Sequence, residues 1–315
     1  MNRDLTSTSV LPPLSSVSRI FSDTYEFYKT HWRLIGQILV VPLVFYLLLF
    51  LKVILPPLVL AIFSLVAGIV LFLARLALFS VAVEGETLAT TFKRAYQRGF
   101  SRILPFIWLS ILLSLAFFGG LVLFFVPGLL LAVWLSVSAF VLFNEDKRGL
   151  AALAASWHYV KGYWLAVFWR FIFLGLLVIL VAFASALIVK ILNSVTTLLL
   201  AAPLKIISEI IVVFVNLFVV TPFLIFYSQR LYQGLKAVKT ELLTEAEQAK
   251  FKKRLTTFII IGLIGVIALA VFAGYLLLQI LPQLKIQTLP GPISGSASSL
   301  GASLGFPSLL DFWPQ

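Results

Sequence analysis

Long runs of apolar residues, separated by short polar connectors, dominate this chain. Seven runs approach the roughly 20 residues that a helix needs to cross a hydrocarbon core, with the fourth at the short end of that range. They cover residues 34–51, 57–82, 103–125, 128–143, 164–188, 206–228 and 256–281. The pattern predicts an all-α, polytopic transmembrane helical bundle.

Proline and glycine mark the shortest breaks between these runs. Pro56-Pro57 and Pro127-Gly128 leave no room for a domain, so we expect tight turns on the outer side of the membrane. Residues 191–203 are too short to span the membrane and too apolar for a free loop. We interpret them as an outer interfacial or re-entrant segment.

A weak internal repeat groups six of the runs into three hairpins. The sequence Tyr-Lys-Thr-His-Trp at residues 28–32 aligns with Val-Lys-Gly-Tyr-Trp at 160–164, and Gln-Arg-Gly-Phe at 97–100 falls between them. Each copy leads into two apolar runs and follows a stretch whose apolar residues recur at helical spacing. We therefore predict three helical hairpins with cytoplasmic amphipathic helices lying along the interface, plus one extra C-terminal transmembrane helix.

This organisation divides the chain into four parts. Thr244 and Glu247 have the spacing of a capping box, which predicts a helix that begins there and enters the membrane near Thr256. Beyond Pro282, Gly, Ser and Pro dominate, as is typical of a flexible tail. The predicted parts are a cytoplasmic N-terminus with an amphipathic interfacial helix (1–33), a six-helix membrane domain (34–235), a cytoplasmic linker helix with the seventh transmembrane helix (236–281), and an external Gly/Ser/Pro-rich tail (282–315).

Composition and charge agree with a membrane protein. The chain is 61% hydrophobic and 11% charged, and it has no cysteine, which excludes disulfides and thiolate metal sites. Most of the 24 Lys and Arg residues lie before the first run and in every second connector, whereas the alternate connectors hold only Lys52, Lys190, Lys205 and Lys285. The positive-inside rule then predicts a multi-pass protein of the inner or plasma membrane with a cytoplasmic N-terminus and an external C-terminus. Because topology explains the net charge of +12, nucleic acid is not an expected partner.

The sequence offers few candidates for catalysis. His31 and His158 lie inside the aromatic-basic motifs, which favours interfacial packing over metal ligation. The pairs Glu84/Glu86 and Glu145/Asp146 lie in connectors beside basic residues, and we interpret them as solvated charge. No nucleotide-binding, zinc-protease or serine-hydrolase motif occurs. We therefore expect no enzyme and no cofactor or metal.

Ionisable residues inside apolar runs are the strongest functional candidates. Arg75 and Arg170 each lie about two turns from the cytoplasmic end of their run, so each either snorkels to the headgroups or faces the bundle interior and holds a lipid phosphate. The full set of candidate lipid-phosphate contacts is Arg75, Arg170, Lys161, Arg98 and the aromatic wall Trp157, Trp164 and Trp169. Glu209 follows Lys205 by one turn, and Asn216 lies seven residues further on the same face, where we expect interhelical hydrogen bonding.

Several motifs between residues 92 and 169 resemble a known family. They are Phe92-Lys93-Arg94-Ala95, Pro127-Gly128, Leu142-Phe143-Asn144-Glu145, Gly149 to Leu153, Ser156-Trp157 and Val160 to Trp164. The chain resembles the bacterial membrane-domain family named after the membrane region of some glycerophosphodiester phosphodiesterases, and neighbouring families of unknown function. The resemblance implies six helices in hairpins. It does not imply phosphodiesterase activity, which belongs to a separate TIM-barrel domain, and the seventh run and the tail depart from the six-helix pattern.

These observations predict a non-enzymatic membrane scaffold that interacts with lipids or organises a partner protein through its aromatic-basic cytoplasmic face. The alternative is a transporter or flippase-like carrier of a lipid or small anionic solute, which requires polar groups at the midplane on discontinuous helices. Expected partners are membrane lipids, including anionic inner-leaflet lipids, and either a protein partner or a second copy of the chain. A third hypothesis, a membrane lipid enzyme, is disfavoured by the residues present. Arg75 and Arg170 facing each other inside the bundle near Glu84 or Glu145 favour the carrier and the enzyme, and outward-facing arginines favour the scaffold.

Overall fold

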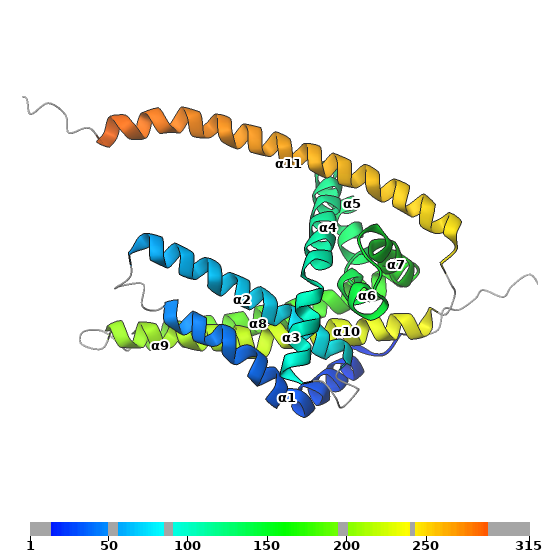
Figure 1. Cartoon of the computed structure of the whole chain (residues 1–315), viewed down its shortest axis with the longest axis horizontal. Helices are drawn as coiled ribbons and strands as arrows, with labels where there is room; N and C mark the ends of the chain where they lie inside the picture. Colours follow the sequence, from blue (N-terminus) through cyan, green and yellow to red (C-terminus); the bar gives the residue numbers. More distant parts are fainter. Residues whose placement is uncertain (1–13, 50–55, 85–90, 195–200, 240–242, 289–315) are drawn as a thin grey trace, which may run out of the picture. The chain divides into compact units, whose positions relative to one another are not determined.

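The computed structural model describes residues 14–49, 56–84, 91–194, 201–239 and 243–288 (Figure 1). Within these ranges the chain is helical without a strand, and seven segments are long and apolar enough to cross a membrane. The helices are α1 (Val17–Leu48), α2 (Pro57–Glu84), α3 (Phe92–Ser101), α4 (Ile103–Leu123), α5 (Phe125–Trp134), α6 (Ser138–Glu145), α7 (Leu150–Val160), α8 (Trp164–Ser194), α9 (Ala201–Phe214), the π-helical η2 (Val215–Val220), α10 (Thr221–Val238) and α11 (Glu245–Thr288). The predicted all-α, polytopic helical fold is confirmed.

The chain divides into two compact units, residues 1–263 and 264–315. The described part of the second unit is the C-terminal portion of α11, which continues past Pro282 to Thr288. The predicted tail therefore begins later than residue 282, because a proline near the end of a helix does not by itself stop it. The rest of the predicted tail lies outside the described residues.

Consecutive spans pack as pairs in the first unit, as the repeat predicts. Contacts join α1 to α2, α4 to α5 and α8 to α9, and α10 returns along α1 and α2 (Figure 1). Two boundaries differ from the prediction. The N-terminal amphipathic stretch is not a separate interfacial helix, because α1 runs without a break from Val17 and is capped by Ser16, whose hydroxyl accepts from the backbone N–H of Arg19. The ends of the predicted 191–203 segment belong to α8 and α9, and residues 195–200 lie outside the described ranges.

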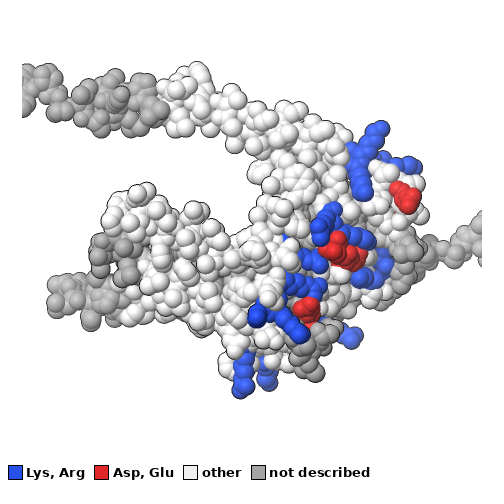
Figure 2. Space-filling model, viewed as in Figure 1, with Lys and Arg blue, Asp and Glu red and all other residues white. Residues whose placement is uncertain are grey.

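Charge is segregated along the helices of the first unit. Figure 2 shows basic and acidic side chains gathered around α3, the α6–α7 connection and the start of α11, while the face over α2 and α9 is uncharged. Large apolar side chains such as Leu65, Leu104 and Leu176 are well exposed on the spans. Such a surface is unfavourable in water and is suited to hydrocarbon, since lipid chains cover apolar side chains without cost.

Two prolines interrupt the hydrogen bonding of spanning helices, and a tyrosine from another helix compensates at each. Pro42 in α1 has no N–H for the carbonyl of Ile38, and the hydroxyl of Tyr96 on α3 donates to that carbonyl at 3.0 Å. Pro222 likewise leaves the carbonyl of Phe218 without its helical donor. The hydroxyl of Tyr28 on α1 donates to it at 2.7 Å. Both tyrosines therefore hold separate helices together at points where hydrocarbon offers no partner.

The fourth span is broken near its middle. Helix α5 ends at Trp134, α6 begins at Ser138, and the turn between them is buried, with Leu135 and Val137 at most 1% exposed. The hydroxyl of Ser156 on α7 donates to the Trp134 carbonyl at 2.8 Å. Non-helical backbone at membrane depth is tolerated where protein surrounds it, and α7 provides that cover.

Helix α7 is consequently a core element. Its residues Ala152 to Ser156 are all buried, so the prediction that this amphipathic stretch lies along the lipid interface is wrong. Its Trp157 packs on the ring of Phe251 from α11, with ring centroids 4.4 Å apart, and does not face the headgroups. The aromatic residues of the third repeat therefore serve packing within the protein.

Two glycines allow close contact between α4 and the first-unit part of α11. A Cβ atom at Gly119 would lie 1.8 Å from the carbonyl oxygen of Phe258, and one at Gly262 would lie 2.0 Å from that of Leu115. Both distances are far below van der Waals contact with rigid backbone. Only glycine fits at these two positions.

We expect the Tyr96–Pro42 pair to be thermodynamically coupled. Tyr96→Phe leaves the Ile38 carbonyl unsatisfied and should lower the free energy of unfolding by about 1 kcal/mol. Pro42→Ala restores a backbone N–H, so the same Tyr96→Phe change in that background should have a markedly smaller effect. Denaturation of the detergent-solubilised chain measures both, with the exposed Tyr25→Phe as control. Additive effects in this double-mutant cycle would contradict the pairing.

The glycine contact predicts a position-specific steric effect. Gly262→Val should destabilise the packing of α11 on α4 by about 1–3 kcal/mol. Gly274→Val is the matched control, because a Cβ at Gly274 meets nothing within 4 Å. Gly262→Val should speed limited proteolysis of the segment before α11 and lower the melting temperature in detergent. Gly274→Val should change neither.

Candidate functional site

Arg98 of α3 and Arg102, which lies between α3 and α4, hold the C-terminal end of α6. Arg98 donates to the carbonyl of Phe143 at 3.3 Å, and Arg102 donates to the carbonyl of Leu142. Arg98 also pairs with Glu84 at the end of α2, and Arg102 lies 3.0 Å from Asp146. Cations at a helix C-terminus satisfy its last carbonyls and interact favourably with its dipole. Arg98, a candidate lipid contact, therefore has a structural role.

Glu145, the last residue of α6, accepts four interactions. The hydroxyls of Tyr159 and Tyr232 both donate to Oε1 at 2.6 Å, and the ammonium groups of Lys147 and Lys236 lie 2.7 and 3.3 Å from its carboxylate. Its side chain is only 12% exposed, so the interpretation of Glu145 as solvated charge is wrong. Burial and the bond to Glu145 raise the pKa of Tyr159 above its ordinary value, so the phenol remains a donor at neutral pH. The cluster is saturated and holds helices together.

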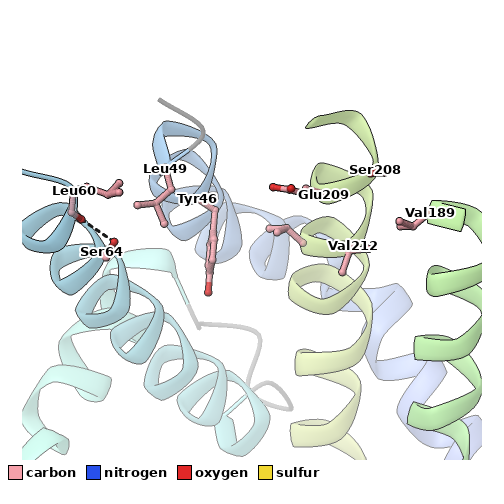
Figure 3. A pocket seen from close by; sticks show the side chains of 9 residues that line it. Tyr46, Leu49, Leu60, Ser64, Val189, Ser208, Glu209 and Val212 are labelled. Carbon is pink, nitrogen blue, oxygen red and sulfur yellow. Dashed lines mark hydrogen bonds between the residues drawn. The ribbon is translucent and has the colours of Figure 1, made fainter. Parts of the chain in front are cut away.

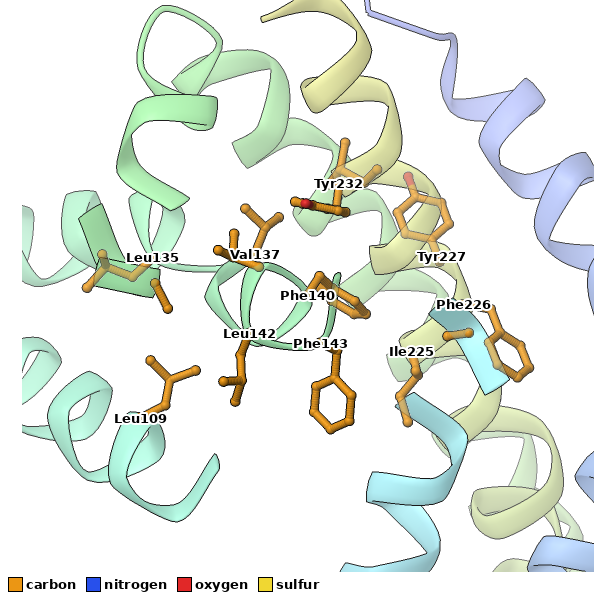
Figure 4. Close-up of a cluster of buried hydrophobic side chains, with 14 of the residues drawn as sticks. Leu109, Leu135, Val137, Phe140, Leu142, Phe143, Ile225, Phe226, Tyr227 and Tyr232 are labelled. Atoms are coloured by element: carbon orange, nitrogen blue, oxygen red, sulfur yellow. The ribbon is translucent and has the colours of Figure 1, made fainter. Parts of the chain in front are cut away.

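The apolar core lies directly beneath this charged cluster. Figure 4 shows Phe140, Leu142 and Phe143 of α6 among Leu109 of α4 and Ile225 of α10. The buried side chains of this region form one contiguous hydrophobic cluster. Charged interactions at the surface of α6 and packing below it thus act on the same short helix.

Arg170 is committed to the protein backbone. It is 9% exposed and donates to the carbonyls of Ala166, Ser15 and Leu14 at 2.8, 2.6 and 3.5 Å. The last two precede the first turn of α1, so Arg170 on α8 fixes the point where α1 begins. An arginine with these partners does not snorkel.

The remaining aromatic-basic candidates have separate partners. Lys161 pairs with Glu247 at 3.0 Å and lies over the ring of Trp157 at 4.9 Å. Trp164 stacks on Phe168 and its indole N–H donates to the Leu130 carbonyl at 3.4 Å. Trp169 is 61% exposed. Among the described contacts, none joins these residues to Arg75 in a common cavity.

Arg75 instead lies in a groove between α1, α2 and the α9–η2–α10 segment. The groove consists of two adjoining cavities of about 500 and 160 Å³, which share Tyr46, Val212 and Val213. Polar residues of the larger cavity are Tyr46, Ser64, Ser208 and Glu209, and those of the smaller are Arg75, Asn216 and Thr221. Figure 3 shows Glu209 extending from α9 toward Tyr46 on α1, with Ser64 on the opposite wall.

Glu209 and Asn216, both predicted as intramembrane polar contacts, line this groove. The side-chain N–H of Asn216 donates to the Val212 carbonyl at 2.9 Å, so its hydrogen bond is within its own helix, whereas the prediction was a bond between helices. The hydroxyl of Thr221 donates to the Asn216 carbonyl at 2.9 Å across the π-helical turn. Such turns are rare, and they occur frequently at functional sites. The side chain of Lys205 lies outside the described set.

Arg75 is the exposed cation of the groove. Its side chain points into the smaller cavity, and within the described ranges no residue forms a hydrogen bond or ion pair with it. Sequence reasoning missed Tyr46, Ser64, Ser208 and Thr221, although each is a polar residue inside or next to an apolar run. The sequence does not reveal that these residues line one groove, because they lie on α1, α2 and the α9–η2–α10 segment.

Metal-ligating side chains do not cluster in the described parts of the chain. No group of three His, Asp or Glu side chains lies close enough there to hold a metal ion. His31 stacks on Phe27 and contacts that residue's carbonyl at 3.0 Å, and His158 is buried in α7.

Comparison with known proteins adds no relative. No protein-family model matches the chain, and neither a curated protein nor a solved structure matches it.

The two neighbouring carboxylates of the α6 terminus should respond differently to neutralisation. Glu145→Gln removes the charge that Lys147 and Lys236 face and should lower the free energy of unfolding by about 2 kcal/mol. Asp146→Asn changes a side chain that is 59% exposed, and its effect should stay below about 1 kcal/mol. Unfolding in detergent compares them. Equal effects would show that Glu145 is not the centre of this cluster.

Proposed function

We propose that this chain is a non-enzymatic, lipid-interacting multi-pass membrane protein that holds the phosphate of a phospholipid on Arg75. The observation that carries the proposal is an exposed guanidinium, without a hydrogen-bond or ion-pair partner among the described residues, in an otherwise largely apolar groove on spanning helices. A charged side chain inside a membrane is costly and needs a partner. Lipid phosphate supplies the negative charge and the acceptor oxygens that a guanidinium binds best.

The groove is suited to a lipid and less suited to a free anion. Its larger cavity of about 500 Å³ is lined mainly by aliphatic side chains such as Leu49, Leu60 and Val189. Because lipid chains and aliphatic side chains are equally apolar, an acyl chain can lie against this surface or in the adjoining bilayer at similar free energy while the phosphate contacts Arg75. Asn216 lines the same small cavity, and its amide oxygen has no partner among the described residues. It can accept from a headgroup hydroxyl or ammonium.

The two intramembrane arginines have different partners, and this difference supports the assignment of the lipid to Arg75. Arg170 is occupied by backbone carbonyls, and Arg75 is exposed and without a partner in the described chain. The sequence prediction treated the pair as one site. Of these two arginines, Arg75 is therefore the proposed lipid contact, and Arg170 acts on the fold.

We also propose the membrane in which the protein lies and its orientation there. The basic cluster around α3 and the start of α11 faces the cytoplasm in an inner or plasma membrane, with the N-terminus inside and the C-terminus outside, following the positive-inside rule. Anionic lipids of that leaflet would contact the basic rim. Membership of the glycerophosphodiester phosphodiesterase membrane-domain family, a protein partner and self-association stay predictions from the sequence.

A carrier function is the second candidate, favoured by helix discontinuities. The fourth span is broken at residues 135–137, and the sixth contains the π-helical η2 beside the groove. Carriers use such discontinuities to place polar groups at the midplane. In this chain only η2 contributes to the groove, since protein buries the break in the fourth span.

Native mass spectrometry of the mildly extracted full chain tests lipid binding. With phosphatidylglycerol added, the parent should retain a lipid that Arg75→Ala loses by about tenfold in apparent affinity, because one charge-assisted contact is removed. Arg75→Lys should retain part of it, and Arg148→Ala, at an exposed charged position, should match the parent.

Inorganic phosphate provides the second arm of this experiment. If native mass spectrometry finds bound inorganic phosphate and no retained lipid, the site binds a free anion. Equal lipid retention in the parent and Arg75→Ala would refute the proposal.

A further inference from the structure

Polar side chains follow one another along the length of the groove. On α2, Ser64 lines the larger cavity and Arg75 the smaller. On the facing segment, Ser208 lines the larger cavity, and Asn216 and Thr221 line the smaller. The order is the same on both walls, so α2 and the α9–η2–α10 segment run in the same direction beside the groove.

The groove covers much of the thickness of a bilayer. From Leu60 to Arg75 the wall on α2 is roughly 22 Å long, and from Ser208 to Thr221 the facing wall is roughly 20 Å long, at 1.5 Å per helical residue. The hydrocarbon core of a membrane is about 30 Å thick. Polar groups therefore occur at several depths between the two headgroup layers.

The groove is also open at its side. Ser64, Arg75 and Asn216 are all exposed, although they line the cavities. A lipid can thus place its headgroup against these residues while its acyl chains remain in the surrounding bilayer. An enclosed cavity would have to accept the chains as well.

We propose that the groove is a path along which a phospholipid headgroup passes between the two leaflets. This inference rests on the proposed lipid site and extends it from binding to passive exchange. The barrier to unassisted exchange is the desolvation of the headgroup in hydrocarbon. Side chains at successive depths replace part of its hydration, and Arg75 holds the phosphate near the inner half of the path.

The π-helical segment supports a path at this position. In η2 the backbone hydrogen bonds join residues five apart instead of four. The backbone N–H and the hydroxyl of Thr221 both donate to the Asn216 carbonyl. Asn216 on this turn is exposed and lines the same small cavity as Arg75. Arg75, the carboxylate of Glu209 and spaced neutral polar groups can contact the phosphate and the hydroxyl or ammonium of a headgroup in turn without trapping it, as exchange requires.

Headgroup exchange is measured with the full chain in vesicles of phosphatidylethanolamine and phosphatidylglycerol. A trace of phosphatidylglycerol carries a nitrobenzoxadiazole group on its acyl chain, and added dithionite reduces only probe in the outer leaflet. The parent protein should extend reduction beyond the outer-leaflet share, at a rate well above that of protein-free vesicles. Vesicle integrity is checked with an entrapped soluble dye.

Two variants assign the activity to the groove. Arg75→Ala should slow exchange by about tenfold, as expected for the loss of one charge-assisted contact. Ser64→Trp fills the larger cavity away from Arg75, so it should abolish exchange while native mass spectrometry still finds lipid retained. Leu65→Trp is the matched control, because this neighbouring side chain is 66% exposed and does not line the groove.

The outcomes separate exchange from binding. A parent chain no faster than protein-free vesicles overturns the exchange path and leaves lipid retention on Arg75 as a separate result. Acceleration that survives Ser64→Trp, or that Arg75→Ala leaves unchanged, overturns the path as well. Acceleration that Ser64→Trp removes and Arg75→Ala lowers, with Leu65→Trp like the parent, supports it.

Discussion

Every peptide group that leaves helical hydrogen bonding inside a membrane must find a partner within the protein, and this constraint shapes the first unit. Tyr96 and Tyr28 serve carbonyls freed by Pro42 and Pro222. Ser156 serves the carbonyl of Trp134 at the break in the fourth span. Because hydrocarbon offers no donor, each of these contacts joins helices that lipid alone would leave independent.

The same constraint explains the place of the charged cluster. Helix α6 has only 8 residues, and its carbonyl end needs donors. Arg98 and Arg102 provide these donors. Glu145 at the same end accepts hydrogen bonds from Tyr159 and Tyr232 and pairs with Lys147 and Lys236. A short, broken span thereby becomes the point where α3, α7 and α10 meet. The residues that look like an interfacial belt in the sequence are used for this assembly.

The sequence predicts the spans well because each depends on a local property, a long apolar run. The break at Leu135 to Val137 is not predictable in this way, since its residues are Leu, Ser and Val and its stability comes from α7. Glu145 looks solvated beside Lys147, and its contacts with Tyr232 and Lys236, far along the chain, show that it is enclosed.

Arg75 and Arg170 show the same limit for the candidate site. They occupy equivalent depths in apolar runs, yet Arg170 meets the carbonyls that precede α1 and Arg75 meets a cavity. The difference depends on which helices pack beside them. Glu209 and Asn216 were identified as polar residues on one face of a helix, but the opposite wall with Tyr46 and Ser64 could not be inferred from one helix alone.

The Tyr28 contact also has a consequence for biogenesis. Tyr28 lies in a helix that leaves the ribosome well before its acceptor at Phe218, which is 190 residues later. The hydroxyl and the carbonyl therefore enter the membrane at widely separated times during synthesis. Until the α9–α10 segment arrives, α1 lacks a contact that it has in the finished protein, and an insertion factor or chaperone has an interval in which to act on that helix.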